Sequence, residues 1–285
     1  MLSILKKLFS GAFALLIALL IFICDVNEGP PKANFFQPVS TQSFTLIDAL
    51  TRAQGIANDG KSYYFSFNYG LIKTALDGTT IEATNYLAIP PKLLLLGDKH
   101  IGGLTYYKGK IYAPIEDSSV FQHLYICTYD AATLKFIAAY ALPLANQEFG
   151  VPWCVADPVN GYIYSARRDD ITTINCYDPE TLQLVKTIEI NTPISKIQGG
   201  DMYKGILYFS VSREDQGVYA VNLKTGEVQE AFPRNLVDGA EGEGMTIIPT
   251  ADGALFHVLD VAKDTLGVHL RNYAFDVNSI DWQMS

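Results

Sequence analysis

The sequence predicts an all-β protein, a β-propeller of five four-stranded blades, preceded by one N-terminal hydrophobic helix. A Gly-x-x-aromatic step recurs five times at intervals of 44 to 52 residues. A second landmark precedes every step, and a third follows all but the last, always in the same order. The segments are rich in Tyr, Thr, Ile and Val and lack the 3.6-residue apolar spacing of helical repeats. Landmarks in a fixed order at a steady period indicate a repeat array.

Turn chemistry divides each repeat into four strands. The glycine steps are GKSYYFS from Gly60, GKIYAPI from Gly109, GYIYSAR from Gly161, GILYFSV from Gly205 and GALFHVL from Gly253. Each glycine lies at a predicted hairpin turn, because Gly and Asn tolerate a positive φ. An Asp-x-x-Thr segment such as YDPETLQL from Tyr177 then predicts a turn between a third and a fourth strand. Four short antiparallel strands per unit are typical of a propeller blade.

The innermost strands and the ring closure can also be predicted. In four repeats the landmark that precedes the Gly-x-x-aromatic step contains a glycine: Gly55, Gly103, Gly199 and Gly244. These glycines are predicted to start the innermost strands, where crowding at the axis would exclude a side chain. Trp153 occupies this position in the third repeat and is expected to plug part of the tunnel. The fifth repeat lacks a fourth strand, and the alternating segment Ser43–Ala49 would complete it and remove two open edges. Six blades, with a degenerate first blade, are the alternative.

Residues 1–26 are predicted to be a membrane anchor or signal segment. Lys6 and Lys7 precede an apolar run from Leu8 to Cys24, which is close to the shortest helix that crosses a bilayer. An uncleaved anchor, ordinary signal cleavage and a lipoprotein acylated at Cys24 remain open. Each places the rest of the chain on the exported side of the membrane, periplasmic or extracellular, because the lysines stay in the cytoplasm. Residues 27–42 are expected to be a linker, and residues 43–285 the propeller domain.

Composition limits the partners and the redox chemistry. The chain carries a formal charge of −9, and without Lys6 and Lys7 it holds 19 basic against 30 acidic residues. Nucleic acid is therefore not an expected partner, because its phosphates would be repelled. Cys127, Cys154 and Cys176 lie in strand-like segments without zinc-site spacing. They are expected to be buried thiols, with one disulfide as the alternative.

The blade pattern resembles a large group of secreted propellers with degenerate repeats, which includes lactonase-like, phytase-like and adhesive or scaffolding members. The segment GAEGEGMTIIPTADGALFHVLD, from Gly239, resembles the Glu-Gly blade openings of the lactonase-like and phytase-like branches. The resemblance implies a propeller over nearly the whole exported chain. It implies no particular reaction, because this fold carries many functions.

The charged residues are predicted to gather on one face of the ring. In a blade, the start of the inner strand and the end of the second strand emerge together, so residues at both places share that face. Those nearest the axis are the candidate ligand-binding residues: Gln54, His100, Glu148, Gln198, Glu241 and Glu243. Arg52 and Asp260 are assigned to the same face. Asp201 is a candidate tunnel ligand or a partner of Lys196.

Two functions follow as expectations. The first is a membrane-tethered propeller that binds a small-molecule or protein ligand on its charged axial face. The alternative is a metal-assisted hydrolase of the lactonase, esterase or phosphatase type, with His100 as a candidate general base. Glu241 and Glu243 are candidate metal ligands, and Ca²⁺ is the candidate ion, because carboxylates and amides supply hard oxygen atoms.

Overall fold

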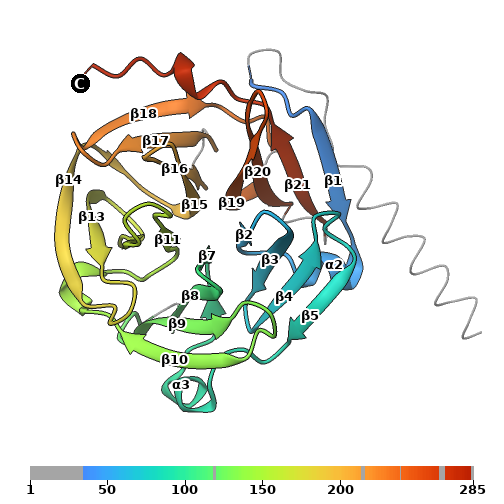
Figure 1. Ribbon diagram of the computed structural model, residues 1–285. Coiled ribbons are helices and arrows are strands. Elements are labelled where there is room, and N and C mark those ends of the chain that lie inside the picture. Colours follow the sequence, from blue (N-terminus) through green and yellow to red (C-terminus); the bar gives the residue numbers. More distant parts are fainter. Residues whose placement is uncertain (1–34, 118–119, 213–215, 238, 263–266, 284–285) are drawn as a thin grey trace, which may run out of the picture.

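The computed structural model describes residues 35–117, 120–212, 216–237, 239–262 and 267–283. They form five antiparallel sheets arranged around a central axis, as Figure 1 shows in a view along that axis. The five-bladed propeller is therefore confirmed, and the six-bladed alternative is wrong. The predicted N-terminal helix lies outside the described residues. Within them, no helix has the length and hydrophobicity needed to span a membrane.

Each blade is a short sheet whose first strand lies innermost. Blade 1 consists of β2 (Ile56–Asn58), β3 (Ser62–Phe67), β4 (Gly70–Ala75) and β5 (Ile81–Asn85). Blade 2 consists of β6 (His100–Ile101), β7 (Thr105–Tyr107), β8 (Lys110–Glu116), β9 (Leu124–Asp130) and β10 (Phe136–Ala141), with β6 and β7 both pairing with β8. Blade 3 consists of β11 (Val155–Ala156), β12 (Ile163–Ser165), β13 (Ile171–Tyr177) and β14 (Leu184–Ile194).

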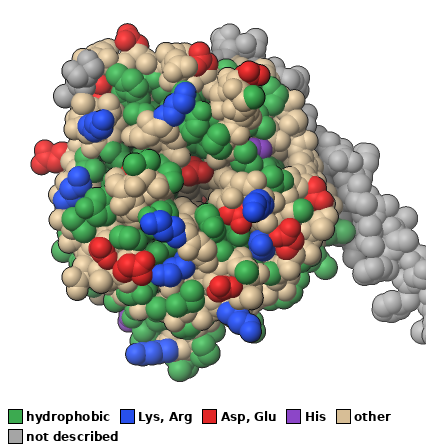
Figure 2. Space-filling view, in the orientation of Figure 1, with side chains coloured by type: hydrophobic (Ala, Val, Ile, Leu, Met, Phe, Trp, Pro, Cys, Tyr) green, Lys and Arg blue, Asp and Glu red, His purple; other side chains and the backbone are tan. Residues whose placement is uncertain are grey.

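The last two blades have the same plan. Blade 4 consists of β15 (Ile197–Tyr203), β16 (Ile206–Val211), β17 (Val218–Asn222) and β18 (Glu227–Phe232). Blade 5 consists of β19 (Ala240–Thr250), β20 (Gly253–Ala262), β21 (Gly267–Tyr273) and β1 (Ser40–Phe44). The short helices are α2 (Leu46–Leu50), α3 (Pro91–Leu96), η1 (Leu144–Asn146) and η2 (Val277–Ser279). Figure 2 shows the same face of the molecule as a surface, with α3 projecting at its lower rim.

The predicted turns are present. Gly109 has a φ of +80° and Gly205 a φ of +78°, values that place these hairpin glycines in the left-handed region. In the turn between the third and fourth strands of blade 3, the Asp178 carboxylate accepts hydrogen bonds from the Thr181 amide at 2.8 Å and hydroxyl at 2.9 Å. Local turn chemistry therefore sets the strand boundaries that the repeats predict.

The ring closes through the N-terminal strand, as predicted, although the boundaries differ. β1 pairs with β21 from Ser40↔Asn272 to Phe44↔Val268. The strand ends because Leu46 adopts a left-handed φ of +55°, and helix α2 follows. The predicted strand at Ser43–Ala49 is therefore wrong in extent. Its apolar alternation belongs to a helix that buries Ala49 and leaves Ile47 exposed.

Four glycines keep the innermost strands in backbone contact, and we call Gly55, Gly103, Gly199 and Gly244 the glycine ring. A Cβ atom on Gly199 would lie 2.6 Å from the Gly244 Cα, and one on Gly244 would lie 2.7 Å from the Gly55 Cα. A Cβ on Gly55 would lie 2.9 Å from the carbonyl oxygen of Gly102, and one on Gly103 would collide with Gln198 and Gly199. The predicted crowding at the axis is confirmed.

Two residues at this level differ from expectation. Trp153 is fully buried in the hydrophobic core of blades 3 and 4, so its side chain packs between blades. The Asp201 carboxylate accepts hydrogen bonds from the Thr246 hydroxyl at 2.7 Å and the Ile247 amide at 2.8 Å. Asp201 therefore joins blade 4 to blade 5, and no contact with Lys196 is present. Cys127, Cys154 and Cys176 are buried free thiols, as expected.

Candidate functional site

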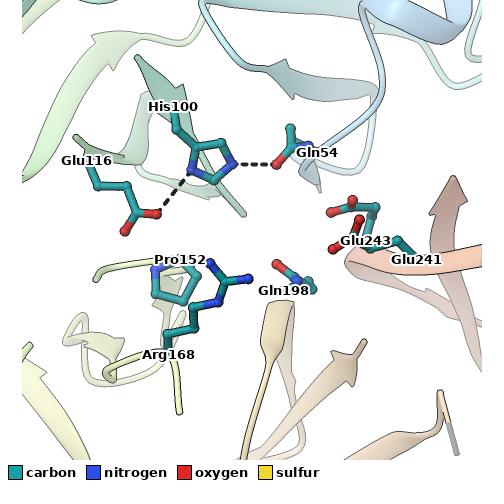
Figure 3. Close-up of a pocket in the computed structure, with 8 residues that line it drawn as sticks. All are labelled: Gln54, His100, Glu116, Pro152, Arg168, Gln198, Glu241 and Glu243. Atoms are coloured by element: carbon teal, nitrogen blue, oxygen red, sulfur yellow. Dashed lines mark hydrogen bonds and ion pairs between the residues drawn. The ribbon is translucent and has the colours of Figure 1, made fainter. Parts of the chain in front are cut away.

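A small pocket lies on the axis, next to the glycine ring, and all five blades contribute to it. Its volume is about 120 Å³. Figure 3 shows the side chains of its lining converging from different strands. The lining consists of Gln54, His100, Glu116, Pro152, Arg168, Gln198, Glu241 and Glu243. Gln54 and Pro152 precede innermost strands, and the other residues of this kind lie within the first residues of β6, β15 and β19: His100, Gln198, Glu241 and Glu243. Glu116 ends β8 and Arg168 follows β12, so both lie at the ends of second strands, as blade topology predicts.

Five of the six candidate residues from the sequence line this pocket: Gln54, His100, Gln198, Glu241 and Glu243. Glu148 does not. Its side chain is 60% exposed and lies 3.4 Å from the Arg167 guanidinium, outside the pocket lining. Glu148 was predicted with the others because it also precedes an innermost strand. The chain between Glu148 and that strand carries it away from the axis.

His100 is held on both sides of its ring. Its Nε2 lies 2.6 Å from the Gln54 Oε1, which can only accept, so Nε2 donates the hydrogen bond. Its Nδ1 lies 3.3 Å from the Glu116 Oε1. Glu116 is itself buried, and its Oε2 accepts a hydrogen bond of 2.6 Å from the Val151 amide. The imidazole is thus oriented by blade 1 and by a carboxylate fixed between blades 2 and 3.

The pocket is rich in carboxylates. Glu116, Glu241 and Glu243 face Arg168 across it (Figure 3). The Arg168 side chain lines the pocket and is partly exposed. Three carboxylates beside one guanidinium give the lining a formal net negative charge. The lining is therefore suited to bind a positively charged group, and Arg168 can bind a negatively charged group beside it.

A buried arginine, Arg234, lies behind the pocket and was not predicted from the sequence. Arg234 is 1% exposed and donates from Nε to the carbonyl oxygen of Gln216 at 2.6 Å. Burial lowers the pKa of Arg234, while the charges of Asp260 and Glu243 favour its protonated form. A Cβ at Gly242 would collide with this guanidinium. Gly242, between the two pocket glutamates, is therefore required by Arg234, and nothing in the spacing of Arg234 signals this role.

Two residues assigned to the charged face are instead buried inside the ring. Arg52 is 0% exposed, forms an ion pair with Asp48 at 2.8 Å and lies over the Phe44 ring at 4.9 Å. Asp260 is also 0% exposed and forms a two-point ion pair with Arg271, with its shorter contact at 2.7 Å. Both assignments are wrong, because Arg52 pairs with Asp48 of helix α2 and Asp260 pairs with Arg271 of the neighbouring strand β21.

No group of three or more His, Cys, Asp or Glu residues in the described ranges is arranged to hold a metal ion. The hydrolase alternative also finds limited support in the lining. The pocket lining contains no hydroxyl or thiol nucleophile. The His100 Nε2 faces Gln54 and its Nδ1 faces Glu116. A general base in this position would first have to lose its contact with Gln54.

A buried carboxyl group lies just before His100 in the chain. Asp98 is 1% exposed, and neither of its oxygens has a hydrogen-bond partner among the described residues. Burial, with a further contribution from the charges of Asp117 and Glu116, raises the pKa of Asp98 to about 6, and His123 opposes this shift. The protonated carboxyl is therefore favoured in the folded protein.

This shift predicts a pH-dependent stability. The folded-state pKa lies above the unfolded value, so the folded form binds more protons between about pH 4 and pH 6, and stability falls as the pH rises through that window. Asp98→Asn should remove this loss and stabilise the protein by about 2 kcal/mol at pH 8, with little effect at pH 4. Urea unfolding at both pH values measures it. The exposed control Asp252→Asn should change little, and equal slopes for Asp98→Asn and the unsubstituted protein would refute the assignment.

Comparison with known proteins adds no relationship: no protein-family model matches the chain, and no curated protein shows significant similarity to it.

Proposed function

We propose that this protein is an exported, membrane-tethered propeller that binds a ligand or protein partner by a cationic group in the axial pocket. The observation that carries the proposal is the convergence of Glu116, Glu241 and Glu243 in one small cavity. The propeller fold is consistent with binding of this kind. The tether rests on the apolar run from Leu8 to Cys24, which lies outside the described residues.

The size of the pocket narrows the ligand class. A drug-sized molecule needs roughly 300 Å³ or more, whereas this pocket has about 120 Å³. It has room for an ammonium or guanidinium group, with the rest of the ligand lying on the face of the ring. Arg168 could then hold a carboxylate beside the bound cation. A free amino acid and a side chain or terminus of a partner protein both have this chemistry.

The glutamate pair gives a direct test. Lysine and arginine should raise the melting temperature of the protein by about 5 °C at a concentration near 100 times Kd, whereas acetate should not. Glu241→Gln combined with Glu243→Gln should abolish this increase, because the cation loses its counter-charges. The substituted protein should remain folded, because Gln keeps the shape of both side chains and Arg234 retains the nearby charge of Asp260.

Glu148→Gln is the matched control, because it removes a carboxylate before another innermost strand but outside the pocket lining. It should leave the response unchanged. Calcium is a further probe of the same residues: an increase in melting temperature that only the double variant loses would make the pocket glutamates metal ligands. If neither amines nor calcium affect the unsubstituted protein, the cation-binding proposal fails.

The lactonase-like and phytase-like resemblance keeps a hydrolase as a second candidate, favoured by the contact between His100 and Glu116. This arrangement would support a base only if substrate displaced Gln54. The binding function requires no such rearrangement, so the geometry favours it.

A further inference from the structure

The connection between blades 1 and 2 carries a helix, α3, that projects from the rim of the ring (Figure 1). One side of this connection is firmly packed: Ala88, Ile89 and Leu93 are buried in the core shared by the two blades. The Tyr129 hydroxyl donates to the carbonyl oxygen of Ala88 at 2.9 Å, and the Ala88 amide donates to Tyr69 at 2.8 Å. The helix is therefore held in a defined position.

The outward side of the same connection is apolar. Leu95 is 89% exposed and Leu87 is 79% exposed, and Tyr86, Leu94 and Leu96 are also exposed. A surface helix of a globular protein ordinarily has polar residues on its outer face. Here the outer face consists of leucines fixed in solvent, which favours a surface that covers them.

The exposed charged residues within positions 83–99 are basic. Lys92 and Lys99 are exposed, and the only acidic residue between positions 83 and 99 is Asp98, which is buried. This is a local exception in a chain with a net charge of −9. At the lower rim of Figure 2, hydrophobic side chains reach the surface with basic side chains beside them. Exposed leucines with a tyrosine and flanking lysines match the layers of a bilayer surface, from the acyl chains to the phosphates.

We propose that the connection from Tyr86 to Lys99 docks onto a lipid bilayer. Leu87, Leu94, Leu95 and Leu96 enter the acyl boundary, and Lys92 and Lys99 bind lipid phosphates. The contact between this connection and the bilayer is small and would be weak alone, so the docking rests on the proposed tether. If residues 1–26 hold the membrane, residues 27–34 span at most about 28 Å before the chain is held on the propeller at Phe36, whose amide donates to the Pro233 carbonyl oxygen. The tether then makes docking an intramolecular event with a high effective concentration.

Site-specific fluorescence on the full chain tests this docking. Leu95→Cys and Val159→Cys are each labelled with bimane and reconstituted with vesicles of equal parts phosphatidylcholine and phosphatidylglycerol. Val159 is the control because it is 87% exposed and lies in a blade 3 hairpin. The unsubstituted chain labelled in the same way gives the background. Brominated lipids should quench bimane at position 95 and leave position 159 unaffected.

The charges are tested with a second pair of substitutions. Lys92→Glu with Lys99→Glu should weaken docking on these vesicles by about tenfold or more, because each lysine near an anionic surface contributes about 1 kcal/mol. On vesicles of phosphatidylcholine alone, the same pair should have a smaller effect. An equal effect on both lipids would overturn the role assigned to the lysines.

The tether and the docking surface can fail separately. If the full chain sediments with vesicles but positions 95 and 159 are quenched equally, docking is overturned and the tether stands. If the chain neither sediments nor is quenched, both are overturned. If position 95 is shielded without lipid and crosslinks to a second chain, the leucines form an interface between copies and the lipid proposal is wrong.

Discussion

Replacing Phe44 with alanine should lower the free energy of unfolding by about 3–5 kcal/mol. Phe44 is the last residue of β1 and is 2% exposed, and its ring packs edge-to-face on Phe65 at 6.0 Å. It also lies beneath the Arg52 guanidinium, which would lose this contact while remaining buried. The variant thus weakens the contact between the N-terminal strand and blade 1. Urea unfolding followed by tryptophan fluorescence or circular dichroism measures the change.

Ile47→Ala is the matched control, because Ile47 is 73% exposed in the adjacent helix and its truncation should cost less than about 0.5 kcal/mol. A chain that begins at Thr51 gives the stronger version of the test. It lacks β1 and α2, leaves β21 as an open edge and should aggregate, unlike a chain that begins at Phe36. Equal stability and solubility of these two chains would contradict the closure of the ring by β1.

Gly244→Ala should destabilise the protein by about 3 kcal/mol or more, because the added methyl group has no room. Its Cβ would meet three backbone atoms of blade 1, the closest being the Gly55 Cα at 2.7 Å. Backbone atoms in a paired strand cannot move aside as the end of a side chain can. The substitution should therefore push blades 1 and 5 apart at the axis, and thermal or urea unfolding should show the loss.

Gly217→Ala is the control for this second substitution. The closest atom to its Cβ would be a ring carbon of Tyr219 at 3.2 Å, so a small side-chain shift can accommodate the methyl group. The cost should be well below that of Gly244→Ala. If both substitutions had the same small effect, the inner strands would not be in the tight contact that the glycine ring describes.

The sequence was enough to predict the number of blades, their hairpins and the segment that supplies the last strand of blade 5. These features depend on short-range chemistry, namely hairpin glycines such as Gly109, the Asp-x-x-Thr turns and the spacing between repeats. It also placed Gln54, His100, Gln198, Glu241 and Glu243 at one axial opening. Blade topology alone requires that residues preceding the innermost strands emerge on the same face.

Which charges are available at that opening depends on contacts between blades. Arg52 and Glu241 both come near the start of an innermost strand, yet Arg52 is buried in an ion pair and Glu241 lines the pocket. Asp260 and Arg168 both come near the end of a second strand, yet Asp260 is buried in an ion pair and Arg168 lines the pocket. Likewise, Leu95 of α3 is exposed, although leucine is a residue type usually found in protein cores. Burial and pairing depend on atoms from other blades, many residues away in the chain. Residue type and spacing alone therefore do not predict those contacts.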